Sequence, residues 1–176
     1  MKKYSLALLF SSLFVTHSAM AISDNTISFQ GEVTDETCSV AVNGNGATPV
    51  ILLPTVSKSA LASSGSTAGQ VTFDIDLTGC TGGATETKIS TVFVGNQVTS
   101  NGNLGNTGSA KNVEVQILDT TGKAINLTNG FTGSGDLKLA AQAKSTSATY
   151  TAQYYATAAA TSGTVNATLQ YAVSYQ

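Results

Sequence analysis

Apolar and polar residues alternate over several short stretches of this chain, and a period of two predicts β-strands. The clearest stretch is VTFDIDL (71–77), in which every second residue is apolar. Similar patterns occupy residues 38–42, 88–94, 112–118, 123–127, 137–143, 149–157 and 164–176. Helical periodicity is confined to one turn at 58–62. Short strands separated by turn residues predict an all-β fold, an antiparallel sandwich of immunoglobulin-like type, with a small barrel as the alternative.

The stretches between these strands contain turn and loop residues. VILLPTV (50–56) is apolar but carries Pro54, and proline indicates an edge strand or a strand end. Residues 96–109 and 128–136 are polar and rich in Gly, and they predict surface loops. These two loops are candidate surfaces for a receptor, although plain solvated loops have the same composition.

An alternating stretch also opens the exported part of the chain. In SDNTISFQGEV (23–33), Ile27, Phe29 and Val33 share one side with Gly31, and polar residues occupy the other. Such a stretch either is the first strand of the domain's own sheet or is a strand meant for another copy of the molecule.

Residues 1–21 have the features of a secretion signal. Lys2 and Lys3 precede the apolar run LALLFSSLFV, and a small-x-small site predicts cleavage between Ala21 and Ile22. The run is too short for a membrane helix. We therefore expect a mature chain of residues 22–176 that forms one domain.

The composition of the mature chain excludes several function classes. His17 is the only histidine and lies in the signal, and the chain has no Arg and no Trp. Without Lys2 and Lys3, six lysines face ten carboxylates, a net charge of 6 − 10 = −4. Nucleic-acid binding requires clustered basic residues, and histidine is the commonest general base and metal ligand. We expect no nucleic-acid partner, no metal, no cofactor and no catalytic residue.

Cys38 and Cys80 are the only cysteines. In an exported chain one disulfide is the default interpretation, and free thiols are the alternative. A bridge would close a loop of about 42 residues and contribute about 4 kcal/mol in the chain-entropy model. Asp74 and Asp76 are the one close carboxylate pair on a strand face, where such pairs normally serve solubility.

Four features together resemble a known family. An alternating strand follows the signal, and one cysteine follows that strand with the other cysteine at a later strand end. Gly163 stands fourteenth from the C-terminus, and the chain ends in a long alternating strand with Tyr175 next to last. The segments GEVTDETCSV, NVEVQILD, AQYYATAAAT and YAVSYQ carry the local likeness. In this respect the mature chain resembles the shaft-forming pilins of chaperone–usher fimbriae.

The resemblance implies an incomplete immunoglobulin-like sandwich that lacks its last strand, completed by a donor strand from another subunit. It implies an N-terminal donor extension at residues 22–31 and a pilin domain at 32–176. Expected partners are copies of the chain in a linear homopolymer, a periplasmic chaperone, an outer-membrane usher, minor pilins and a tip adhesin. The expected location is a cell-surface fimbria reached through the periplasm.

The resemblance also assigns roles to single residues. Ile27 and Phe29 are the expected groove-filling side chains of the donor strand, with Asn25 and Gly31 in the same register. Many family members carry Gly near the position of Asn25. Cys38 and Cys80 match the family's disulfide. Residues expected in the groove or in recognition by the chaperone are Gly163, Leu169, Tyr171, Val173 and Tyr175.

Two other functions are the alternatives to a structural subunit. A single-domain adhesive subunit would bind a host receptor with its own surface. A secreted enzyme is disfavoured, because the mature chain lacks His and Arg and has no convincing acid pair.

Overall fold

The computed structural model describes residues 38–176. The expected signal, its cleavage site at Ala21 and Ile22, and the donor residues Asn25, Ile27, Phe29 and Gly31 lie outside these residues, so they remain predictions.

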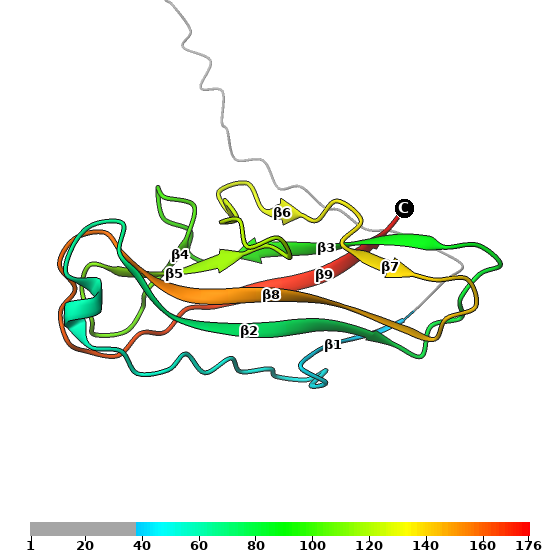
Figure 1. The fold of residues 1–176 in the computed structure, drawn as a ribbon, viewed down its shortest axis with the longest axis horizontal. Coiled ribbons are helices and arrows are strands. Elements are labelled where there is room, and N and C mark those ends of the chain that lie inside the picture. The colour runs from blue at the N-terminus through cyan, green and yellow to red at the C-terminus, as the bar shows by residue number, and fades with distance from the viewer. Residues whose placement is uncertain (1–37) are drawn as a thin grey trace, which may run out of the picture. The chain divides into compact units, whose positions relative to one another are not determined.

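The regular secondary structure of the described chain is almost entirely β-strand, as the alternation predicts (Figure 1). The first strands are β1 (Ser39–Val42), β2 (Thr67–Thr78), β3 (Thr87–Gly95), β4 (Leu104–Gly105) and β5 (Val113–Leu118). They are followed by β6 (Phe131–Thr132), β7 (Leu137–Leu139), β8 (Ser145–Ala156) and β9 (Leu169–Tyr175). One 3₁₀ turn, η1 (Lys58–Leu61), matches the helical turn expected at 58–62.

The strands form two antiparallel sheets. One sheet has the order β1-β2-β8-β5-β4. In the other, β9 occupies one edge of β3 from Ile89 to Gly95, so that β6 and β7 lie in succession along the opposite edge. Among the described residues, β3 is the only strand that pairs with β9.

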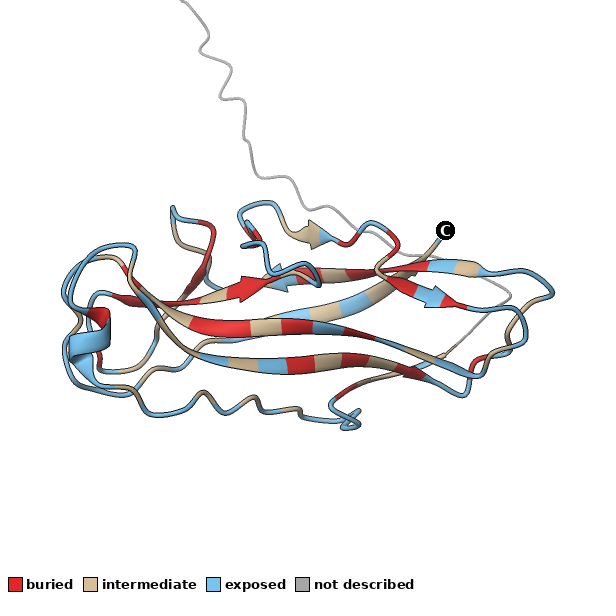
Figure 2. Ribbon diagram, in the orientation of Figure 1, coloured by how far each residue is buried: buried red, intermediate tan, exposed pale blue. Residues whose placement is uncertain are grey.

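The core lies between the sheets and follows the alternation of the sequence. The inward side of β2 supplies Phe73, Ile75 and Leu77, which are all buried (Figure 2). Phe73, Phe93 and Tyr150 form an aromatic cluster with ring centroids 4.8 to 6.3 Å apart. The hydroxyl of Tyr150 donates a hydrogen bond to the carboxylate of Asp136.

Three sequence predictions differ from the structure. The apolar run 50–56 is not a strand. The second arm of the predicted hairpin at 123–127 is reduced to one bridge between Leu118 and Ala124. The predicted surface loop 96–109 contains β4, and Asn103 and Leu104 are buried within it. Asn103 is satisfied there by donating to the Glu114 carboxylate at 2.9 Å, a contact that local periodicity does not reveal.

A disulfide joins Cys38 and Cys80, as expected, with 4.3 Å between the Cα atoms. It connects Cys38, the residue before β1, to Cys80, two residues beyond the end of β2, so it fixes the edge of the five-stranded sheet.

Replacing both Cys38 and Cys80 with alanine should lower the free energy of unfolding by about 4 kcal/mol, because the unfolded chain regains the entropy of a 42-residue loop. Urea denaturation of the two proteins, followed by circular dichroism, measures the difference. An unchanged midpoint would show that the bridge does not constrain the unfolded chain.

Candidate functional site

An apolar groove runs along β9 on the side away from β3. Its volume is about 460 Å³, and its floor includes the core residues Phe73, Ile75 and Phe93. One wall is the segment that leads into and includes the first part of β9, with Val165, Ala167, Leu169 and Tyr171 among the lining residues. The other wall is the segment 49–53. The groove therefore opens directly onto the core of the sandwich.

The backbone N–H and C=O groups of β9 point alternately toward β3 and toward this groove. The N–H of Asn96 donates to the carbonyl of Thr168, and the N–H of Gln176 donates to Lys88, so even-numbered residues face β3. The carbonyls of Thr164 and Asn166 accept hydrogen bonds from the backbone N–H groups of residues 110 and 107, so the even-numbered residues are paired here as well. Because backbone groups alternate along a strand, those of residues 165, 167, 169, 171 and 173 point to the opposite edge. No described residue pairs with that edge between 165 and 173.

The same odd-numbered residues present their side chains to the interior. Val165, Ala167, Leu169, Tyr171 and Val173 are all half-buried and pack against the main core. The unpaired edge of β9 thus combines main-chain hydrogen-bonding groups with an apolar face.

The opposite wall also lacks backbone pairing. Residues 48–56 make no backbone hydrogen bond to any described residue, although they run alongside the sandwich between β1 and η1 (Figure 1). Proline at 49 and 54 removes two donors from this segment. Ile51 packs against the core, whereas its neighbours Val50 and Leu52 are exposed.

Tyr154 lies at one end of the groove. It lines the groove and also a second cavity of about 560 Å³ that includes Lys58, Leu61 and residues 160–166. Burial raises the pKa of the Tyr154 phenol above its ordinary value.

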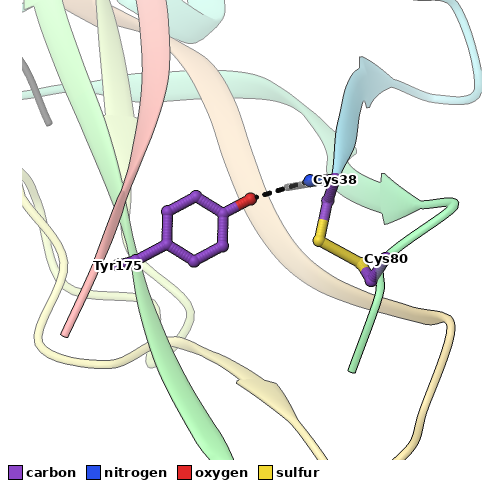
Figure 3. The surroundings of a disulfide bond; sticks show 3 residues. All are labelled: Cys38, Cys80 and Tyr175. Atoms are coloured by element: carbon purple, nitrogen blue, oxygen red, sulfur yellow. Dashed lines mark hydrogen bonds between the residues drawn. A yellow bond between two sulfur atoms is a disulfide. The ribbon is translucent and has the colours of Figure 1, made fainter. Parts of the chain in front are cut away.

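Tyr175 connects the two sheets beside the disulfide (Figure 3). Its hydroxyl accepts a hydrogen bond from the backbone N–H of Cys38 at 3.0 Å. The last strand is therefore attached to the first described strand through one phenol, an interaction that the sequence pattern did not predict.

Gly163 is required by a close backbone approach. A Cβ at this position would lie 2.4 Å from the nitrogen and 2.7 Å from the Cα of Ala110. The next residue, Thr164, accepts a hydrogen bond from the Ala110 N–H at 3.0 Å. Glycine thus allows the chain to pass Ala110 just before it enters the groove.

The structure brings the sequence-predicted residues of the last strand together. Leu169 and Tyr171 line the groove, and Val173 and Tyr175 pack against the same core beyond it. Their recognition by a chaperone stays a prediction. The wall at 49–53 was missed as a site, and its only signal in the sequence was an apolar run bounded by two prolines.

Asp74 accepts a hydrogen bond from the Thr149 hydroxyl and Asp76 accepts one from the Gly44 N–H, and both residues are half-buried on β2. Residues 38–176 hold no group of three or more side chains suited to a metal ion. None of the helices described there could cross a membrane.

An antiparallel sandwich with an unpaired strand edge above an apolar groove defines a class of domain whose surface suits the addition of a β-strand. Comparison with known proteins then identifies the family. The family model for "Fimbrial protein" matches residues 27–176.

Two curated relatives are similar over most of their length. The "F17 fimbrial protein" of Escherichia coli is 39% identical over 90% of this chain and 91% of its own. The "Major fimbrial subunit SMF-1" of Stenotrophomonas maltophilia is 37% identical over 86% and 92%. The crystal structure of the P pilus rod subunit PapA shares the fold, with a TM-score of 0.62 at 20% identity over 79% of this chain and 99% of that one.

This chain belongs to the fimbrial protein family. It is a structural subunit of a surface fimbria and not an enzyme.

Replacing Tyr175 with phenylalanine should destabilise the domain by about 1 kcal/mol, because the N–H of Cys38 loses its acceptor. Tyr171→Phe is the matched control, since no hydrogen bond of the Tyr171 hydroxyl is found among the described residues. Urea denaturation of both variants gives the comparison. Equal midpoints would contradict a stabilising role for the Tyr175 hydroxyl.

Gly163→Ala should destabilise by about 1–3 kcal/mol, because the added methyl group overlaps the backbone of Ala110. Gly46→Ala is the control, because a Cβ there meets only the Val40 carbonyl at 3.6 Å. Thermal unfolding measures both. A Gly163→Ala midpoint no lower than that of the control would show that the neighbouring backbone adjusts freely.

Proposed function

We propose that this subunit polymerises by donor-strand exchange, with residues 22–31 of one copy filling the groove along β9 of the next. The observation that carries the proposal is the unpaired edge of residues 165–173, whose side chains form one wall of an apolar groove. A strand added there gains main-chain hydrogen bonds, and its alternate side chains enter the groove.

The dimensions of the two partners agree. The edge from Val165 to Val173 spans eight steps, about 26 Å at roughly 3.3 Å per residue. The ten residues 22–31 reach about 33 Å when extended. Ile27 and Phe29 are two apart, as are the groove-lining residues Leu169 and Tyr171, so an extended segment can present both to the groove.

The segment 48–56 supplies a second edge to the donor. Because neither this segment nor the facing side of β9 has backbone partners among the described residues, a strand between them can pair on both sides. Such a strand would satisfy two sets of main-chain groups at once. Its release must break both ladders, so the fibre would resist dissociation kinetically.

The same geometry supports a requirement for a chaperone before assembly. A subunit with an unpaired strand edge above an apolar groove lined by half-buried residues is prone to aggregate. We propose that a periplasmic chaperone covers this groove during export, with Gly163, Leu169, Tyr171, Val173 and Tyr175 in or beside the contact, and that an outer-membrane usher exchanges it for the donor strand. Minor pilins and a tip adhesin are the further partners proposed for the fibre.

The experiment compares two substitutions on opposite sides of the donor strand. Phe29→Asp places a charge in the apolar groove and should abolish the ladder of polymers on unboiled SDS gels, because burial of an unpaired carboxylate is costly. Ser28→Asp places the same charge on the other side and should keep the ladder. Each variant is co-expressed with the chaperone and usher of its fimbria.

Folding of the Phe29→Asp subunit with its chaperone, shown by co-purification, would locate the defect in assembly. Equal ladders for the two variants would refute the assignment of Phe29 to the groove. A subunit that unfolds on deletion of residues 22–30 would show instead that these residues belong to the domain's own sheet.

A further inference from the structure

The chain enters the described domain beside the last residues of β9. The N–H of Cys38 donates to the Tyr175 hydroxyl at 3.0 Å, and the disulfide to Cys80 holds Cys38 in this place (Figure 3). Side chains of a strand stand roughly perpendicular to the sheet, so Cys38 lies level with Tyr175 along β9. Val165, at the far end of the edge at residues 165–173, is ten steps from Tyr175, about 33 Å when each step covers 3.3 Å.

A spacer of six residues, 32–37, separates the extension at 22–31 from Cys38. From Gly31 to Cys38 there are seven steps, and a fully extended chain covers at most about 25 Å in seven steps. This limit determines which part of β9 the extension of the same copy can reach.

An added strand can pair with β9 in either of two directions, and the antiparallel one is favoured. Antiparallel pairing is the more stable per residue. The opposite wall at 48–56 has little influence on the direction, because Pro49 and Pro54 remove two of its backbone donors. An antiparallel strand that covers the edge with its odd-numbered side chains toward the core has Gly31 beside Val165.

We infer that the spacer 32–37 prevents a copy from filling its own groove in this direction, so that the strand has to come from another copy. The inference rests on the proposed polymerisation. With Gly31 beside Val165, the spacer would have to return about 33 Å to Cys38, and at full extension it covers about 25 Å. A tether that cannot span its two sites gives an effective concentration near zero, whereas one that can span them gives about millimolar.

The parallel direction has no such limit. A parallel strand would have Gly31 beside Val173, within reach of Cys38 through the same spacer. The direction of the inserted strand therefore distinguishes the two arrangements.

The first test lengthens the spacer. Six Gly and Ser residues inserted between Gly31 and Glu32 raise its limit to thirteen steps, about 47 Å, which exceeds the distance to be spanned. On release from the chaperone, the lengthened subunit should close on itself. Its ladder should fall at least ten-fold, and an SDS-resistant monomer should form at a rate independent of subunit concentration.

The control has the same insert between Ala84 and Thr85, in the exposed turn between β2 and β3, and should keep its ladder. An undiminished ladder in the lengthened subunit, or a lost ladder without the resistant monomer, would overturn the inference.

The second test measures the direction and the source of the inserted strand. An antiparallel strand has residue 30 beside residue 166, and a parallel strand has it beside residue 172. After oxidation, the pair Gln30→Cys, Asn166→Cys should form a disulfide between copies of the unmodified chain and within one copy of the lengthened chain. Asn166 and Ala172 are both exposed, so Gln30→Cys, Ala172→Cys is the matched control and should form neither disulfide.

The length limit and the proposed polymerisation fail in different ways. A disulfide of the first pair within one copy of the unmodified chain would refute the length limit. If strand exchange itself is wrong, this pair forms no disulfide between copies, and Phe29→Asp keeps its ladder. If only the length limit is wrong, the disulfide forms between copies and the lengthened chain keeps its ladder.

Discussion

The strand edge at residues 165–173, which pairs with no described residue, is the constraint on which the rest of the structure depends. A strand that exposes its main-chain groups above an apolar groove leaves both hydrogen bonds and burial incomplete. The chain cannot satisfy this edge with residues 38–176, because β3 is the only described strand that pairs with β9. We propose that a strand from outside these residues pairs with this edge. Until that strand is added, other contacts must hold β9 in position.

Several interactions hold β9 from the side of β3 and at both ends. The carbonyls of Thr164 and Asn166 accept from the loop at 107–110, where Gly163 permits the close approach. At the other end, the side chain of Gln176 donates to Ser90 at 2.8 Å, and the Tyr175 hydroxyl binds Cys38 beside the disulfide. These contacts fix the edge at 165–173 in position without pairing it to any described residue, so binding of the proposed donor strand would cost little entropy for ordering this edge.

Much of this architecture could be predicted from residue patterns, and the predictions that were wrong share one cause. Alternation located β2, β3 and β8 because their inward residues are buried within the domain itself. Residues 50–56 were ambiguous because an extended segment without a partner forms no ladder and is not a strand. Asn103 and Leu104 were assigned to a surface loop because their burial depends on Glu114 and β5, which lie beyond any local window. A prediction from local periodicity is wrong where residues distant in the sequence determine whether a segment is buried or paired.

Gly163 and Tyr175 show why a family motif does not by itself reveal what a residue does. Both positions match the recognition pattern of the family, but contacts within the domain already explain both residues. At Gly163 the nearby backbone leaves no room for a Cβ, and the Tyr175 hydroxyl accepts a hydrogen bond from the N–H of Cys38. Substitution of either residue would weaken the fold, so a loss of the proposed chaperone contact could not be separated from this destabilisation. Leu169 and the other odd-numbered residues that line the groove differ from these two. Their backbone groups on the groove side form no hydrogen bond with any described residue. These residues and the edge that they form are therefore the part of the domain that is specific to the proposed strand addition.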